Sequence, residues 1–215
     1  QRIAHEIRNP LTPLQLSVEK IYKKFKPKDS NEVKVFNNYL ETIQRQVDDI
    51  GNLAGEFSSF ARMPSVNLYP GDLNNVIQTQ LSLFKISNSN IKWNYINKLP
   101  IDFKIKIDSQ KIRQALTNIF QNSVDSIKEN SFILEGKINI LTEFHNKNIL
   151  LIIEDNGVGF PTNRDNLTNP YVTLRKKGTG LGLSIVQRIV EEHNGKLILS
   201  DSKLGGAKII IEFLI

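Results

Sequence analysis

The stretch FNNYLETIQRQVDDIGNLAGEFSSFA, residues 36–61, repeats apolar side chains in alternating steps of four and three. This spacing places one apolar stripe along a helix and indicates that another helix packs against it. Residues 3–25 carry a second stripe, and the polar, proline-containing segment 26–31 separates the two. The pattern predicts an antiparallel helical hairpin. Its apolar positions are Ile3, Ile7, Leu11, Leu14, Val18, Ile21 and Phe25, then Phe36, Leu40, Ile43, Val47, Ile50, Ala54, Phe57 and Ala61.

Two helices cannot enclose both apolar stripes well. We therefore expect two copies to form a homodimer whose hairpins make a four-helix bundle. The alternative is an intramolecular pair that the rest of the chain covers. The periodicity stops near Pro64, which prevents helix continuation. We expect a domain boundary there, with residues 1–62 forming the hairpin and residues 66–215 forming a second domain.

The second part of the chain mixes helix and strand patterns, so the predicted fold class is α+β. Asp72 and Asp108 each precede an amphipathic segment, as N-cap residues do. Residues 156–178 lack periodicity and are rich in Asn, Gly and Pro, which predicts a long loop that could act as a lid. The expected helices span 72–87, 109–128 and 179–194, and the expected strands span 91–97, 102–107, 137–144, 149–154, 196–201 and 207–213.

Composition excludes several classes of protein. The 215 residues are 40% hydrophobic and 23% charged, which is ordinary for a globular domain. The absence of cysteine excludes disulfides and thiolate chemistry. No apolar run approaches the ~20 residues of a membrane span. The chain starts at Gln1 inside a helical pattern, so we interpret it as a cytoplasmic fragment whose parent has sensor or inner-membrane segments upstream.

The net charge of +6 does not by itself indicate nucleic acid. Lysines are scattered, and the densest run lies at residues 23–28, at the expected end of a helix. Cations are favourable at that end because they complement the helix dipole. We therefore expect a solvated helix end and no direct contact with nucleic acid.

Residues 5–10 read HEIRNP and combine groups suited to nucleophilic chemistry. Two helical positions correspond to ~200° of rotation, so His5 is expected to face solvent, away from the apolar stripe. Glu6 could orient one ring nitrogen and leave the other nucleophilic, and Asn9 lies one turn later on the same face. Pro10 is expected to kink the helix. The zinc motif H-E-x-x-H is excluded because residue 9 is Asn.

Two motifs further along the chain suit a nucleotide. Asn118 and Asn122 lie four apart on one predicted helix face, and amide oxygens are acceptable ligands for Mg²⁺. The stretch DNGVGF, residues 155–160, follows a predicted strand, so its carboxylate could accept a hydrogen bond from an adenine amino group. Its glycines would let a ligand approach the backbone. Taken alone, the amides could be helix caps and DNGVGF a simple turn.

The stretch GTGLGL, residues 178–183, leads into an apolar helix whose first N–H groups could bind phosphate. A Rossmann fingerprint would require a preceding strand, but the polar residues 175–177 precede it instead. A G-x-x-x-x-G-K-[ST] phosphate loop is also absent from the sequence. The glycine motif is therefore weak evidence when considered alone.

Together, the four motifs in this order resemble the sensor histidine kinases of two-component systems. HEIRNP is similar to the phosphoacceptor box, residues 118–122 to the N box, and DNGVGF and GTGLGL to the two glycine boxes. Residues 170–175 and 5–17 are most similar to the nitrogen-regulation subgroup of the NtrY type, although Leu174 departs from the expected threonine. The resemblance implies a dimerisation hairpin followed by the α/β sandwich of the GHKL ATPases, which include Hsp90-like and MutL-like proteins.

The resemblance also implies that ATP phosphorylates His5, with Glu6 as hydrogen-bond acceptor or general base. Asn9 would position water to remove phosphate from an aspartate of a partner. That partner would be the receiver domain of a response regulator, expected to be of the NtrC-like class. Such transfers depend mainly on positioning and charge neutralisation.

For the second domain, the resemblance implies a site for ATP and Mg²⁺. Asn122 would hold the metal, Asn118 would support the phosphates and Asp155 would recognise adenine. The other residues expected to contact the nucleotide are Gly157, Gly159, Arg175, Lys177, Gly178, Thr179, Gly180, Leu181 and Gly182.

Two other functions are compatible with parts of this pattern. One is a GHKL-type ATPase that uses ATP to drive a clamp-like conformational change, which leaves the HEIRNP motif unexplained. The other is a non-kinase phosphatase or dimeric scaffold that keeps the nucleotide site for folding. Covalent phosphate on the protein after incubation with Mg·ATP distinguishes the kinase from both.

Overall fold

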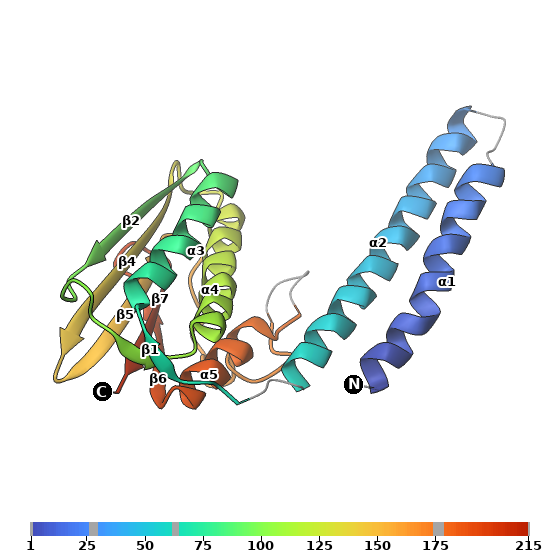
Figure 1. The fold of residues 1–215 in the computed structure, drawn as a ribbon. Coiled ribbons are helices and arrows are strands. Elements are labelled where there is room, and N and C mark those ends of the chain that lie inside the picture. The colour runs from blue at the N-terminus through green and yellow to red at the C-terminus, as the bar shows by residue number, and fades with distance from the viewer. Residues whose placement is uncertain (1, 26–29, 62–64, 174–178, 215) are drawn as a thin grey trace. The chain divides into compact units, whose positions relative to one another are not determined.

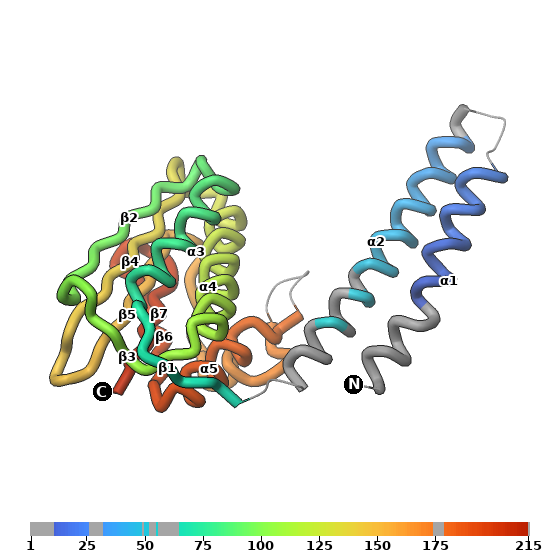
Figure 2. Tube along the Cα trace, viewed as in Figure 1, coloured from blue at the N-terminus to red at the C-terminus, as the bar shows by residue number. Residues whose placement is uncertain are grey.

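The computed structural model describes residues 2–25, 30–61, 65–173 and 179–214, and Figure 2 traces them. Within the helices, the side chains of residues 2–10, 30–31, 49, 52–54 and 56–61 are not among those described. The chain separates into two compact units, Gln1–Pro64 and Ser65–Ile215. Each unit is treated by itself below. Helices long and apolar enough to cross a membrane do not occur among the described residues.

The first unit is the predicted helical hairpin, formed by α1 (Arg2–Lys24) and α2 (Ser30–Ala61), which lie side by side (Figure 1). Helix α1 is assigned without a break through Pro10. One row of apolar side chains, only 5–8% exposed, joins the two helices. Its members follow one another at intervals of seven along each helix and are Leu11, Val18, Leu40 and Val47. Beside this row, the Gln15 amide donates a hydrogen bond of 2.7 Å to Asp48.

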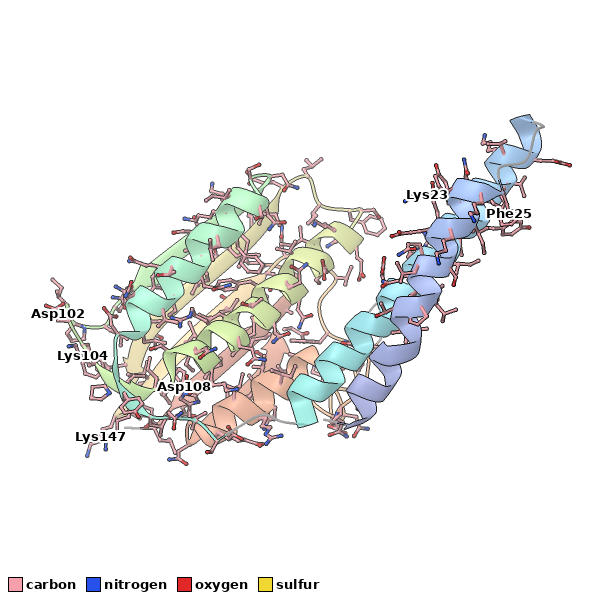
Figure 3. The ribbon with its side chains drawn as sticks, turned by 45° about the vertical axis from the view of Figure 1, so that its right-hand side comes forward. Lys23, Phe25, Asp102, Lys104, Asp108 and Lys147 are labelled. Carbon is pink, nitrogen blue, oxygen red and sulfur yellow. The ribbon has the colours of Figure 1, made fainter. Side chains whose placement is uncertain are left out.

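A second apolar row of the hairpin is not covered within one chain. Its members are also seven apart on each helix and keep 39–50% of their surface exposed, and they are Leu14, Ile21, Ile43 and Ile50. Phe25, near the end of α1, is still more exposed and is labelled in Figure 3. Among the side chains that the structure describes, one hairpin therefore buries one apolar row and leaves the second row exposed.

The second unit is a sheet with helices on one face (Figure 1). The sheet has the strand order β2-β4-β5-β7-β6; β2 and β4 pair in parallel and the other neighbours are antiparallel. In chain order the elements are β1 (Tyr69–Gly71), α3 (Leu73–Ser87), β2 (Ile91–Asn97), β3 (Ile105–Ile107), α4 (Ser109–Glu129), β4 (Gly136–His145), β5 (Asn148–Asp155), α5 (Gly182–Glu192), β6 (Gly195–Asp201) and β7 (Ala207–Phe213). The predicted α+β class is confirmed, as is the antiparallel pairing of β4 with β5.

Helix α4 is the central helix of the layer, because it packs against both α3 and α5. Phe120 on α4 is fully buried, and its ring meets the rings of Phe84 and Trp93 edge-on at 5.4 Å in each case. Such aromatic pairs stabilise a core beyond the area that they bury. This packing fixes the position of α4 on the sheet, and α4 carries both asparagines of the predicted N box.

Three local features differ from the predicted elements. The predicted strand 102–107 shortens to β3, because Asp102 has a left-handed φ of 60° that a strand cannot accommodate. Strand β3 pairs with β1, which the periodicity missed because it has only three residues and contains a proline. Helix α5 starts at Gly182 instead of residue 179, because Gly180 has a φ of 71°.

Candidate nucleotide site and phosphoacceptor helix

The site in the second unit is built around Asp155, the last residue of β5, whose side chain is buried. Its Oδ2 accepts a hydrogen bond of 2.8 Å from the Ser123 hydroxyl on α4. Its Oδ1 accepts bonds from the backbone N–H groups of Gly157, at 2.9 Å, and Ala207, at 3.1 Å. A buried carboxylate is stable only when such donors compensate its lost hydration. The end of β5 therefore presents a fixed acceptor, as recognition of an amino group requires.

The glycines beside Asp155 are needed because protein segments approach each other closely. A Cβ at Gly157 would lie 2.2 Å from the Ser126 hydroxyl oxygen, and a Cβ at Gly206 would lie 2.4 Å from Oδ1 of Asp155. Gly159 has a φ of 76°, which a residue with a side chain rarely adopts. The sequence suggested that Gly157 allows a ligand to approach the backbone. The structure shows that Gly157 also allows the close approach of helix α4.

The N box and the second glycine box meet in space although about 60 residues separate them in the sequence. A Cβ at Gly182, the first residue of α5, would lie 3.4 Å from Oδ1 of Asn118 and 3.7 Å from Nδ2 of Asn122. Both asparagines are half-buried, and Nδ2 of Asn118 donates to the Gln114 carbonyl at 3.0 Å. The missing side chain of Gly182 thus leaves the start of α5 open toward two amide groups. Phosphate oxygens and a hard cation suit this combination.

The second glycine box is also held by the loop that precedes it. Tyr171 donates its backbone N–H to the Gly180 carbonyl at 3.0 Å, and a Cβ at Gly180 would lie 2.5 Å from the Tyr171 carbonyl carbon. Next along the box, Leu181 is fully buried and its N–H points to the Thr179 hydroxyl at 3.4 Å. The other predicted contacts of this box, Arg175, Lys177 and Gly178, lie outside the described residues.

In its described part, the predicted lid is bonded to the sheet at its first residue, Asn156, which exchanges hydrogen bonds with the backbone of Lys137 on β4, and again at Arg164. Arg164 forms an ion pair with Asp201 on β6, and its guanidinium carbon lies 5.9 Å from the centre of the Phe160 ring. The described part of the lid, residues 156–173, contains neither helix nor strand, as the sequence predicted. Residues 174–178 of the same loop lie outside the described residues.

The residues present fit Mg²⁺ held mainly by phosphate and water. Within the described residues there is no group of three or more His, Cys, Asp or Glu side chains that could hold a metal. Mg²⁺ does not need such a group, since it keeps several waters and uses one or two protein oxygens with substrate phosphates. The Asn122 side chain beside Gly182 can supply one amide oxygen of this kind.

The predicted phosphoacceptor residues His5, Glu6 and Asn9 lie on α1. Their side chains lie outside the described part of the structure, so their orientation and their roles stay predictions.

Sequence reasoning missed several groups that hold the site together. Ser123 anchors Asp155, and the Ser126 hydroxyl accepts from the Val158 N–H at 3.0 Å. Both serines continue the buried stripe of α4, so hydroxyls on an otherwise apolar face were the available signal.

Asn130 and Asn156 also fix the first glycine box. Their bonds run from Nδ2 of Asn130 to the carbonyls of Asn156 and Gly157, at 3.1 Å each, and from Nδ2 of Asn156 to the Glu135 carbonyl at 2.9 Å.

Comparison with known proteins agrees with this geometry. A family model described as "Histidine kinase-, DNA gyrase B-, and HSP90-like ATPase" matches residues 107–215. A second, described as "His Kinase A (phospho-acceptor) domain", matches residues 1–65. The two domains therefore follow each other in the order that the sequence motifs predicted.

Individual proteins are similar to nearly the whole chain. Nitrogen regulation protein NtrY of Azorhizobium caulinodans is 38% identical over 208 residues, which cover 95% of this chain and 27% of that protein. An NtrY-like sensor histidine kinase of Rickettsia bellii is 39% identical over 215 residues, covering 99% of this chain and 34% of that protein. The chain thus spans about a third of the length of these curated relatives.

A solved structure extends the likeness to the fold of the whole chain. The crystal structure of histidine kinase ThkA in complex with response regulator protein TrrA has a TM-score of 0.69 and 24% identity, covering 99% of this chain and 59% of that one. From the matched domains, the chain belongs to the histidine kinase-, DNA gyrase B- and HSP90-like ATPase family, with a His Kinase A (phospho-acceptor) domain preceding the ATPase domain.

Proposed function

We propose that this chain transfers the γ-phosphate of ATP to His5 and passes it on to an aspartate of a response regulator. The observation that carries this proposal is the convergence of Asn118 and Asn122 with Gly182. The two asparagines lie on the helix whose Ser123 is bonded to the buried Asp155. These groups could bind a nucleotide in a chain whose residues 1–65 match a phospho-acceptor domain. A nucleotide site without that domain would favour a plain ATPase.

In the proposed reaction, the second unit binds and positions while the hairpin supplies the nucleophile. Asp155 would accept a hydrogen bond from adenine, and the N–H groups at the start of α5 would face the phosphates. Mg²⁺ near Asn122 would neutralise charge on the phosphates. An unprotonated ring nitrogen of His5 would attack the γ-phosphorus to form an N–P bond, while the bond from that phosphorus to the bridging oxygen breaks and ADP leaves with its electron pair. Glu6 would take the proton from the other ring nitrogen, so the product is a phosphoramidate whose imidazole ring is uncharged.

The proposed homodimer follows from the exposed apolar row of the hairpin. The row runs along both helices and includes Leu14 and Ile21 on α1 and Ile43 and Ile50 on α2. Apolar side chains at heptad spacing are stable in water only when a partner covers them. A second copy offers a matching row and would complete a four-helix bundle.

The response regulator is proposed to be of the NtrC-like class, on the resemblance of residues 5–17 and 170–175 to the NtrY type. Asn9 is proposed to hold the water that removes phosphate from that regulator. Replacing Asn9 with Ala should spare phosphorylation of His5 but slow the loss of phosphate from the regulator. A location of the parent protein at the inner membrane is a proposal that rests on the same resemblance.

Incubation with γ-labelled ATP and Mg²⁺ tests the proposed activity directly. The unaltered chain should acquire acid-labile covalent phosphate, and the His5→Gln variant should acquire none while still binding ATP. His145→Gln, which alters an exposed histidine of the other unit, is the matched control and should label normally. Hydrolysis of ATP without labelled protein would instead favour the clamp-like ATPase, and nucleotide binding without turnover would favour the phosphatase or scaffold.

A further inference from the structure

Helix α5 meets α4 at both ends of α5, near the middle of α4 and near its start. At one end, the start of α5 meets the N box, as the neighbours of Gly182 show. At the other end, His193 directly follows α5 and reaches Asp108, which directly precedes α4. Figure 3 labels Asp108 at this end of α4. The family motifs occupy the first end only, and the second end has no function so far.

His193 is a buried histidine whose two ring nitrogens both have partners. Nε2 lies 2.9 Å from the backbone N of Asp108, and Nδ1 lies 2.7 Å from the Ile189 carbonyl oxygen. A backbone N–H can only donate and a carbonyl can only accept. Nε2 must therefore accept and Nδ1 must carry the proton, which is the neutral form of the ring. The Phe213 ring of β7 packs edge-on against the imidazole at 6.5 Å.

The side chain of Asp108 joins a third segment at the same point. Its Oδ1 caps α4 by accepting from the N–H groups of Gln110 and Lys111, at 3.0 and 3.1 Å. Its Oδ2 accepts from the N–H of Asn67 at 3.1 Å. Asn67 lies in the stretch that leads into β1 from the boundary between the two units. One residue thus ties together the start of the second unit, the N-box helix and the glycine-box helix.

We propose that His193 is a positioning residue for nucleotide binding, acting by fixing α5 against the start of α4. Helix α5 has 11 residues and is therefore ~16 Å long. A rotation at its His193 end moves Gly182 at its other end relative to Asn118 and Asn122. Binding geometry in such sites is sensitive to displacements of about 1 Å. The imidazole lies at the end of α5 opposite to Gly182, so its effect on the proposed site would pass through the helix.

This inference rests on the proposed nucleotide site. It predicts a selective loss of nucleotide affinity, which a purely structural role of His193 would not produce. Three substitutions separate the two bonds of the ring. His193→Gln keeps an acceptor that can reach the Asp108 N–H. His193→Asn keeps a donor to the Ile189 carbonyl but is too short to reach Asp108. His193→Leu keeps neither bond and preserves an apolar filling.

The test measures the dissociation constant of a non-hydrolysable ATP analogue with Mg²⁺, the KM for ATP and the kcat of autophosphorylation, all on the full chain. His193→Leu and His193→Asn should each weaken binding and raise KM about tenfold, as loss of a partner for one buried N–H implies. Their kcat at saturating ATP should stay within about twofold of the unaltered chain, since the chemistry at His5 is untouched. His193→Gln should bind within about twofold of the unaltered chain.

The outcomes distinguish this inference from the proposed activity. The positioning role would be overturned if His193→Asn bound the ATP analogue as tightly as the unaltered chain. It would also be overturned if His193→Gln and His193→Asn lost affinity for the analogue equally. If His193→Leu fails to fold, the comparison of Gln with Asn still decides, because both are polar and differ in the bond that they keep. Nucleotide binding without covalent phosphate would reject the kinase reaction alone, whereas a complete absence of binding in the unaltered chain would reject both.

Discussion

The hairpin and the second unit solve the problem of burying apolar surface differently. The second unit encloses its own core, in which Ile77, Leu116, Ile119 and Phe120 are fully buried. The hairpin buries only one of its two heptad rows and leaves the other 39–50% exposed. A sheet covered by helices closes around a core within one chain, whereas two helices have too little surface to do so. The first unit should therefore depend on a second copy, and the second unit should not.

The largest expected effect tests the self-sufficient core. Phe120→Ala removes the ring that meets Phe84 and Trp93 and should destabilise the second unit by about 3–5 kcal/mol. Phe132→Ala, at an almost fully exposed position, is the matched control and should change stability little. Urea unfolding followed by Trp93 fluorescence measures both variants. Equal midpoints for the two variants would contradict the assigned core.

The next effect tests the dependence of the hairpin on a partner. Ile43→Asp places a charge in the exposed row, and it should disfavour the dimer by about 2 kcal/mol or more for each altered side chain. Arg45→Asp introduces the same carboxylate at an exposed position on the same helix outside that row. Sedimentation equilibrium should show a shift toward monomer for Ile43→Asp and none for Arg45→Asp. If the unaltered chain is monomeric at all concentrations, the comparison between the units fails.

A smaller effect concerns the anchor of Asp155. Ser123→Ala leaves a buried carboxylate without its hydroxyl donor and should destabilise the second unit by about 1–3 kcal/mol. Ser82→Ala, which removes an exposed hydroxyl bonded within α3, provides the control. Thermal unfolding and ATP affinity, measured together, should both decline for Ser123→Ala. A loss in Ser82→Ala of the same size would mean that the Asp155 contact has no special role.

The smallest effect depends on pH. Burial raises the pKa of Asp108, but hydrogen bonds from three backbone N–H groups lower it, and the net pKa lies below the ordinary 3.8. A carboxyl with a lowered folded pKa contributes stability above its unfolded pKa, and this stability is lost as the pH falls through the folded value. The second unit should therefore lose stability in that acid range.

Asp108→Asn isolates this contribution, because asparagine is also a good N-cap but does not titrate there. Urea unfolding between about pH 2 and about pH 6 should show a flatter dependence on pH for Asp108→Asn than for the unaltered chain. If the free energy of unfolding fell equally with pH in the two proteins, Asp108 would not be a cause of the acid sensitivity.

Much of the fold could be predicted because neighbouring residues encode it. Several features can be recognised from residues that lie close together in the sequence. They are the heptad rows of the hairpin, the caps at Asp72 and Asp108, and the alternation in β4 and β5. The four motifs also lay within short stretches, and their order was enough to indicate the family. The bonds from Asp72 to the Asn75 N–H and from Asp108 to the Gln110 N–H confirm the two caps.

The sequence by itself determined most of the helices and strands, the family and the residue types of the site, because periodicity and short motifs are local. Only the tertiary structure decided that β2 pairs with β4, that Ser123 holds Asp155, and that His193 reaches Asp108 across 85 positions of sequence. It also decided which heptad row one chain buries. These contacts arise when distant segments pack together, and each depends on the combined shape of several elements, which no single stretch of residues encodes.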